Sequence, residues 1–137
     1  MSCNSMIYTA NTSNVVVNVV NDQFVQVPFG SVARRFGRNL TLDGGGIVAC
    51  GSGYYKCTCS LTVVPTTEGE ITAQLYQDGN PVPGAKMTQT AGAAGDYVGL
   101  SFPCAVRNVG CESSSVLSVC VNAPCTIVNF SCLVEKE

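Results

Sequence analysis

Hydrophobic and polar residues alternate along most of this chain. In residues 53–64, GYYKCTCSLTVV, Tyr55 and Val63 belong to one set of alternate positions, and Lys56 and Thr58 belong to the other. A period of two places successive side chains on opposite faces of a β-strand. No stretch of useful length spaces its apolar residues as an amphipathic helix does. The pattern therefore predicts an all-β protein.

Clusters of Gly, Pro, Asn, Asp and Ser interrupt the apolar segments and predict turns between the strands. Asp78-Gly79 is a tight-turn signal. Pro81 and Pro83 place the segment that follows at a sheet edge or in a loop. The predicted strands are residues 6–10, 14–20, 23–27, 39–42, 46–50, 53–64, 70–78, 85–90, 96–106, 114–121 and 125–134.

About ten short strands without a helix predict a single-domain, antiparallel jelly-roll β-sandwich. The chain has 137 residues, which is enough for one domain with a buried core. The polar residues 1–12, which include Cys3, are expected to form an N-terminal arm, and residues 13–137 the jelly-roll domain.

The surface is expected to carry little charge. Only 12% of the residues are charged, against roughly a quarter in typical soluble domains. This composition suits a protein that hides much of its surface in an assembly. A small β-protein with a Thr- and Asn-rich exterior explains it equally well.

The charge pattern gives no sign of a nucleic-acid or membrane partner. The net charge is −2, and ARRFGR, with Arg34, Arg35 and Arg38, is the one basic cluster. We interpret it as a solvated turn, because nucleic-acid binding needs a broad basic face. The longest apolar run, VVVNVV, is far shorter than the about 20 residues of a membrane helix. The first residues do not resemble a secretory signal, so we expect a protein made in the cytoplasm.

Nine cysteines and no histidine limit the metal and disulfide chemistry. An odd number of cysteines excludes a complete set of intrachain disulfides. Zinc sites favour Cys-x-x-Cys spacing, whereas Cys57 and Cys59 are separated by one residue in a predicted strand. Their side chains would share a face about 6.5–7 Å apart, which is awkward for one metal ion and too far for a disulfide. We expect no bound cofactor.

Core packing is the favoured interpretation of four of the cysteines. Cys57, Cys59, Cys104 and Cys132 each fall on the apolar set of their predicted strands, and a buried free cysteine behaves as a small hydrophobic residue. Two pairs that flank turns could form disulfides outside the cell, namely Cys120 with Cys125 and Cys104 with Cys111.

No constellation of residues indicates catalysis. Nucleophilic catalysis needs a base beside the nucleophile, and there is no histidine to supply it. The acidic residues fall mostly in predicted turns or at the tail, where solvation explains them. The glycine-rich stretch DGGGIVACG precedes no helix that could bind a phosphate. Its glycines more simply supply positive φ in a hairpin. We therefore expect a protein that is not an enzyme.

The order of segments resembles the jelly roll of the tumour necrosis factor and complement globular-head superfamily. The resemblance rests on DGGGIVACGSGYYKCTCSLTV, ITAQLYQDGNPVPGA, YVGLSFPCAVRN and CTIVNFSCLVEKE, and it covers about residues 6–134. The chain is also similar to small jelly-roll structural proteins of phages of gut Firmicutes.

The resemblance implies a compact homotrimer. In the family, aromatic residues on the outward face of the inner sheet meet near the threefold axis, and by position Tyr54 and Tyr76 are the candidates here. These 137 residues contain no Gly-X-Y repeat, so we do not expect the collagen-like stalk that often precedes this domain in the family.

Two functions are compatible with these features. The first is a structural protein of a phage particle, assembled in the host cytoplasm as a trimeric capsid decoration or head-fibre subunit that contacts the capsid or other virion proteins. The second is an adhesion module that binds a surface carbohydrate or receptor. The absence of tryptophan and the presence of only five tyrosines weaken the second function.

Overall fold

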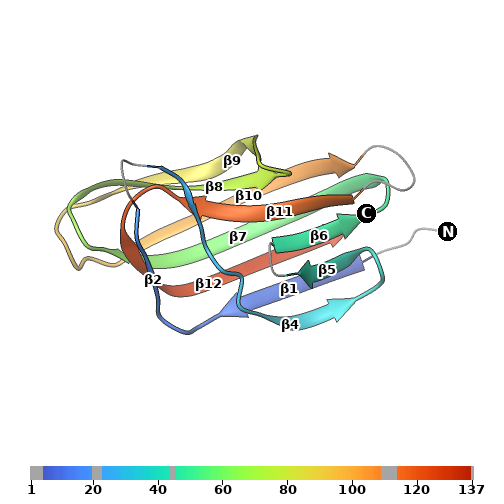
Figure 1. Ribbon diagram of the computed structural model, residues 1–137, viewed down its shortest axis with the longest axis horizontal. Helices are drawn as coiled ribbons and strands as arrows, with labels where there is room; N and C mark the ends of the chain where they lie inside the picture. Colours follow the sequence, from blue (N-terminus) through green and yellow to red (C-terminus); the bar gives the residue numbers. More distant parts are fainter. Residues whose placement is uncertain (1–4, 20–22, 44–45, 109–113, 137) are drawn as a thin grey trace.

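The computed structural model describes residues 5–19, 23–43, 46–108 and 114–136, and these form an elongated two-layer β-sandwich (Figure 1). The described residues contain twelve strands and no helix, and so none that could span a membrane. The strands are β1 (Ser5–Asn11), β2 (Val15–Val17), β3 (Val25–Gln26), β4 (Ser31–Phe36), β5 (Leu40–Asp43), β6 (Gly46–Cys50), β7 (Gly53–Pro65), β8 (Gly69–Gln77), β9 (Asn80–Ala91), β10 (Val98–Asn108), β11 (Ser114–Val121) and β12 (Cys125–Lys136).

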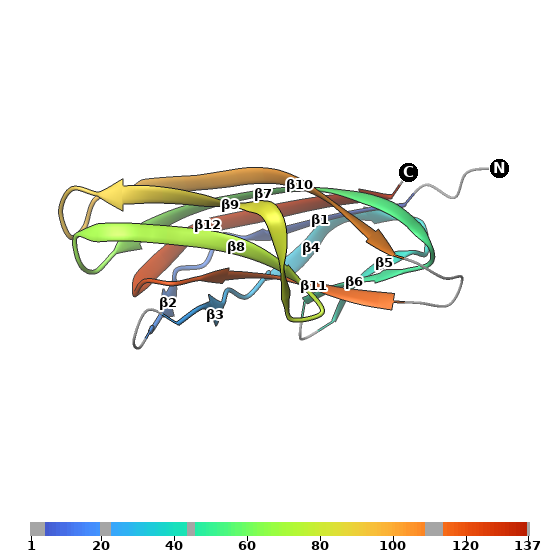
Figure 2. The ribbon, with the colours of Figure 1, turned by 90° about the horizontal axis from the view of Figure 1, so that it is seen from above.

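The strands form two sheets in which every described pair is antiparallel. Sheet A has the order β10-β7-β12-β1-β4, with β2 also paired to β12. Sheet B has the order β5-β6-β11-β8-β9, with β3 also paired to β11. Consecutive strands often lie in different sheets, as the view from above shows (Figure 2). The prediction of an all-β jelly-roll sandwich is confirmed.

The alternation in the sequence becomes the division between core and surface. Along β7, every second side chain from Tyr55 to Val63 is at most 2% exposed, while Lys56 and Thr58 between them are exposed. Both sheets contribute their inner faces to one core, with Leu100 from β10 and Leu117 from β11 fully buried. Because a strand's side chains alternate, each long strand gives half of them to the core.

The strand β4 was not predicted. The sequence analysis interpreted ARRFGR as a solvated turn, but Ser31–Phe36 pairs with β1 at the edge of sheet A. All six residues of β4 are exposed. An edge strand that faces solvent on both sides has no apolar alternation, so the pattern could not reveal it.

The β8–β9 hairpin confirms the Asp78-Gly79 turn and corrects the segment after it. Asp78 has φ +52° and Gly79 φ +82°, as a two-residue type I′ hairpin requires. The strand β9 begins directly after the turn, although residues 85–90 were predicted. Pro81 and Pro83 are accommodated because β9 is the outer strand of sheet B, where a missing N–H can face solvent.

Most of the segment expected as an arm belongs to the sandwich. Ser5–Asn11 forms β1, which lies between β12 and β4. Ile7 of β1 is fully buried in the core. Residues 1–4 of the expected arm lie outside the described residues.

Candidate interaction surface

The outward side of sheet A is a broad face built mainly from small side chains. Pairing aligns its residues in rows across β10, β7, β12 and β1. One row contains Ser101, Ser60, Ser131 and Ala10. The neighbouring row contains Pro103, Thr58, Leu133 and Tyr8. These two rows together are called the A face below.

The A face carries no charge in its described residues. The residues from β7 and β10 in these rows are exposed, and Ser131 and Leu133 of β12 are half-buried. Burying a hydroxyl costs less free energy than burying an unpaired charge, so these rows are cheaper to remove from water than a charged surface. Charged residues border the A face. Arg34 of β4 lies opposite Tyr8 at the end of the second row, and Lys56 of β7 lies opposite Glu135 of β12 in the next row.

Tyr54 lies on the same outward side of sheet A, near the start of β7. Its side chain is 60% exposed, and the guanidinium carbon of Arg107 lies 5.5 Å from the centre of its ring. This distance is within the range of a cation–π contact. The two residues are directly opposite in the β7–β10 pairing, so the sheet fixes their contact.

Tyr76 lies on the other sheet. It belongs to β8 of sheet B, and its ring meets that of Phe24 edge-on, with the ring centres 5.9 Å apart. Burial raises the pKa of the Tyr76 hydroxyl. The two tyrosines selected from the sequence are therefore not brought together, because their strands lie in different layers.

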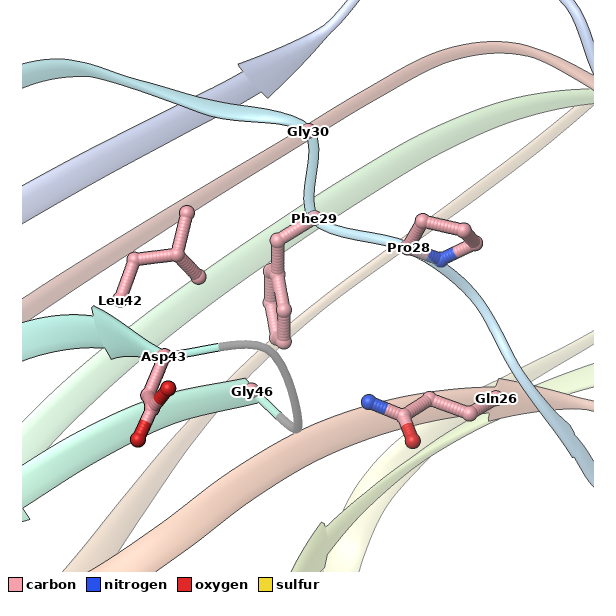
Figure 3. Close-up of a pocket in the computed structure, with 7 residues that line it drawn as sticks. All are labelled: Gln26, Pro28, Phe29, Gly30, Leu42, Asp43 and Gly46. Carbon is pink, nitrogen blue, oxygen red and sulfur yellow. The ribbon is translucent and has the colours of Figure 1, made fainter.

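A cavity of about 300 Å³ opens between the segment before β4 and the β5–β6 hairpin (Figure 3). The Phe29 ring faces into it between the two segments, and the polar side chains of Gln26 and Asp43 lie at its rim. Phe29 is only 4% exposed and stacks on Phe130 in the core, with ring centres 5.2 Å apart. The cavity thus offers one carboxylate and one amide above an apolar floor.

Three of the four cysteines assigned to the core are buried, and the four form two facing pairs. Cys57, Cys59 and Cys132 are at most 2% exposed. Cys104 is half-buried and packs against the core. Cys59 lies opposite Cys132 with a distance of 3.3 Å between the sulfurs, and Cys57 lies opposite Cys104. Among the described residues, no three Cys, Asp or Glu side chains gather as a metal site would require.

The disulfide suggested for Cys120 and Cys125 does not fit this arrangement. Both are free thiols. Cys120 alternates with the buried residues of β11 and so points away from the core, whereas Cys125 begins β12 in sheet A and is fully buried. Two side chains that point in different directions from different sheets cannot be bridged without backbone movement. The other suggested pair involves Cys111, which lies outside the described residues.

In the described part of the sandwich, every buried side-chain nitrogen and oxygen has a hydrogen-bond partner. The Tyr55 hydroxyl donates to the carbonyl of Cys50 at 2.8 Å, and burial raises the pKa of this hydroxyl. Asn108 donates from Nδ2 to the carbonyl of Ala49 at 2.8 Å and accepts from the Ser115 hydroxyl. These contacts tie strand ends together, which is a structural role.

The sandwich is the jelly roll of the tumour necrosis factor and complement globular-head type, as the sequence resemblance predicted.

Individual solved structures agree over nearly the whole chain. Murine APRIL matches with a TM-score of 0.72 and 12% identity, over 98% of this chain and 99% of that chain. The globular domain of zebrafish complement 1qA matches with a TM-score of 0.62 and 9% identity, over 97% and 96% of the two chains. The PRD1 vertex protein P5 matches with a TM-score of 0.59 and 14% identity, over 97% and 96%. At such low identities the likeness shows the fold alone.

Sequence comparison adds no relative. No protein-family model matches the chain, and no curated protein matches it.

Proposed function

We propose that this chain is a non-enzymatic structural subunit of a phage particle, a homotrimer that serves as a capsid decoration or as part of a head fibre. The observation that carries the proposal is the A face, an uncharged surface of small residues across four strands of one sheet. A monomer in solution usually surrounds itself with mixed charges. A surface this poor in charge suits burial against identical neighbours.

The A face also fits the trimer that the family resemblance implies. Tyr54 lies on the same outward side, beyond the row that contains Lys56. Tyr8 in the second row of the A face is 36% exposed. Aromatic residues are enriched at protein interfaces. In this arrangement Tyr54 contributes to the trimer contact. Tyr76 does not, because it lies on sheet B.

The similarity to a phage vertex protein supports the virion part of the proposal. That protein's name places it at the vertex of its particle, and its fold matches over nearly its full length. The fold by itself supports many functions. The virion assignment is therefore tested separately from the trimer.

The test is to quantify the chain in purified particles of a phage that encodes it, by mass spectrometry against labelled peptides. The proposal predicts that the chain co-purifies with the particles in a copy number that is a multiple of three. If the chain is found in the lysate but not in the particles, the virion role is contradicted. The trimer is then tested separately, by measuring the mass of the purified protein.

A carbohydrate- or receptor-binding adhesion module is the second candidate. It is favoured by the aromatic pair on sheet B, where Phe24 is 41% exposed beside Tyr76. Gln26 at the rim of the Figure 3 cavity follows Phe24 by two residues. Aromatic rings beside polar groups are a usual sugar-binding arrangement. Binding on a glycan array that is lost in Phe24→Ala and kept in Phe36→Ala, another exposed phenylalanine, would favour this function.

A further inference from the structure

Cys57 and Cys104 face each other across two neighbouring strands. They are directly opposite in the antiparallel pairing of β7 and β10. Both side chains point to the inner side of sheet A. Directly opposite residues in an antiparallel pair have Cβ atoms about 4.5–5.5 Å apart, and a disulfide brings them to about 3.5–4.5 Å. The sheet therefore places the two thiols side by side, and a small closing movement joins them.

The two thiols differ in their access to solvent. Cys57 is 2% exposed, whereas Cys104 is half-buried. The reason is that β10 is the outer strand of sheet A and lies beside β9, the outer strand of sheet B (Figures 1 and 2). A groove of about 390 Å³ opens there, lined by Ala105 and Val106 of β10 and by Pro81–Pro83 of β9. Cys104 does not line this groove, but it directly precedes Ala105, and its half-buried side chain is the thiol of the pair that solvent reaches.

The two thiols also differ in acidity. The neighbouring Cys57 side chain lowers the pKa of Cys104. The Cys104 side chain, followed by burial, raises the pKa of Cys57. The thiolate is the reactive form of cysteine. The more accessible sulfur is thus also the more nucleophilic one, and its partner holds a proton.

We propose that Cys104 and Cys57 are a peroxide-reactive thiol pair, with Cys104 as the attacking sulfur and Cys57 as the resolving one. The Cys104 thiolate attacks one oxygen of hydrogen peroxide, the O–O bond breaks, and the leaving hydroxide takes up a proton to become water. Cys104 is then a sulfenic acid. The Cys57 sulfur attacks Cys104, the S–O bond breaks, and the leaving hydroxide combines with the Cys57 proton. The two sulfurs are oxidised to one disulfide, and one peroxide is reduced to two waters.

A second pair in the same sheet serves as an internal control. Cys59 and Cys132 have their sulfurs only 3.3 Å apart, yet they are 0% and 1% exposed. They lie on β7 and β12, and both strands have neighbours on each side. If proximity alone decided oxidation, this pair would react as readily. If access to solvent decides oxidation, Cys57 and Cys104 react, while Cys59 and Cys132 stay reduced.

The experiment uses the full reduced chain, treated with hydrogen peroxide, alkylated in denaturant and digested with trypsin. Lys56, Lys86 and Arg107 place Cys57 in a peptide of residues 57–86 and Cys104 in one of residues 87–107. The proposal predicts a disulfide between these two peptides, while Cys132 is recovered alkylated. In Cys59→Ala the link persists, which assigns it to Cys57.

If Cys57 is the resolving cysteine, its removal leaves Cys104 oxidised but without a disulfide partner. In Cys57→Ala the linked peptide is lost, and Cys104 is instead trapped as a sulfenic acid by dimedone. The exposed Cys50 is the matched control, and Cys50→Ala leaves the link unchanged. The proposal is overturned if Cys104 stays reduced in the unmodified chain, or if it is linked to a cysteine other than Cys57. Fragmentation of the linked peptides distinguishes Cys57 from Cys59, so the unmodified chain decides this point even if a variant fails to fold.

Discussion

Gly46 occupies a position where even a β-carbon does not fit. Its φ of +143° is disfavoured for L-residues, and a Cβ built there would overlap the carbonyl oxygen of Leu117 on β11. The sequence analysis assigned the glycines of DGGGIVACG to a hairpin, and Gly46 indeed pairs with Asp43 in the β5–β6 hairpin. The overlap with Leu117 adds a requirement that comes from packing, not from the turn.

Gly46→Ala is therefore expected to lower the free energy of unfolding by more than about 1 kcal/mol, because it combines backbone strain with a clash against main-chain atoms. Gly99→Ala is the matched control, since its backbone has no positive φ and a Cβ there would meet no atom within 4 Å. Urea denaturation of both variants measures the difference. Equal stabilities for the two variants would contradict the packing described around Gly46.

Buried thiols make stability depend on pH in the alkaline range. Burial raises the pKa of Cys125 from 9.0 to about 11. The unfolded chain therefore loses this proton at a lower pH than the folded chain does. The contribution to stability is complete below pH 9 and falls as the pH rises from 9 towards 11.

The free energy of unfolding is expected to fall over this pH range, and the fall is expected to be smaller in Cys125→Ala, which cannot ionise. Denaturation at pH 8, 9, 10 and 11, which spans the range between the two pKa values, measures both slopes. Identical slopes in the two proteins would show that Cys125 is ionised as easily in the folded chain as in the unfolded one.

At the scale of strands, the sequence was most informative where a strand has one buried face. Residues 53–64 and 125–134 alternate strongly, and they became the two long central strands β7 and β12. Two of the four outer strands were harder to predict, because β4 is exposed on both faces and β9 carries two prolines. Alternation reports burial, and strands at sheet edges are the least buried.

Register was the part of the site that the sequence could not supply. The sequence placed Cys57, Cys59, Cys104 and Cys132 on apolar sets but could not show that they face one another as two pairs. Those pairings join residues far apart in the chain, and they depend on which strands become neighbours. For the same reason Tyr54 and Tyr76 could be placed opposite the core, but not on separate sheets.

The β8–β9 turn is attached to the neighbouring strand β11. The Asp78 N–H donates to the carbonyl of Val116, and the Asp78 carboxylate accepts from the Val116 N–H at 2.9 Å. Asp78 also has positive φ, which aspartate and asparagine tolerate better than other residues do. One residue thus satisfies the turn and holds it against the sheet.

Asp78→Ala is expected to lower the free energy of unfolding by about 1–2 kcal/mol, because it removes a side-chain hydrogen bond and leaves a β-carbon at positive φ. Asp78→Asn keeps an oxygen acceptor and a tolerated conformation, so its loss is expected to be about 0.5 kcal/mol or less. Thermal unfolding of the two variants measures the gap. A large loss in Asp78→Asn would mean that the carboxylate charge matters more than the turn.

At the scale of the whole molecule, the two outer surfaces of the sandwich differ. The A face presents serines, Thr58 and Pro103 without charge. Charged residues of sheet A, such as Lys56 and Glu135, lie outside these two rows. The outward side of sheet B carries Lys86 on β9 and the Phe24–Tyr76 pair. If copies of the chain associate through one side, the uncharged rows of the A face favour sheet A, and the outward side of sheet B stays available for other contacts.

Thr58→Arg is expected to disrupt the trimer without unfolding the protomer. Thr58 is exposed and lies between Pro103 and Leu133 in the middle of the A face. An arginine there would bring an unpaired charge into the contact, a cost of several kcal/mol, while an exposed substitution changes folding stability by about 0.5 kcal/mol or less.

Thr90→Arg on β9 is the matched control, because Thr90 is an exposed strand residue on the outward side of sheet B. Light scattering after size-exclusion chromatography is expected to show monomers for Thr58→Arg and trimers for Thr90→Arg. The reverse outcome would move the interface to sheet B.

The most direct measurement is native mass spectrometry of the unmodified chain. Self-association through the A face predicts a trimer of the 14.3 kDa chain with no bound metal. A monomer at all concentrations tested would contradict the account, because the uncharged A face would then be an ordinary solvent-exposed surface.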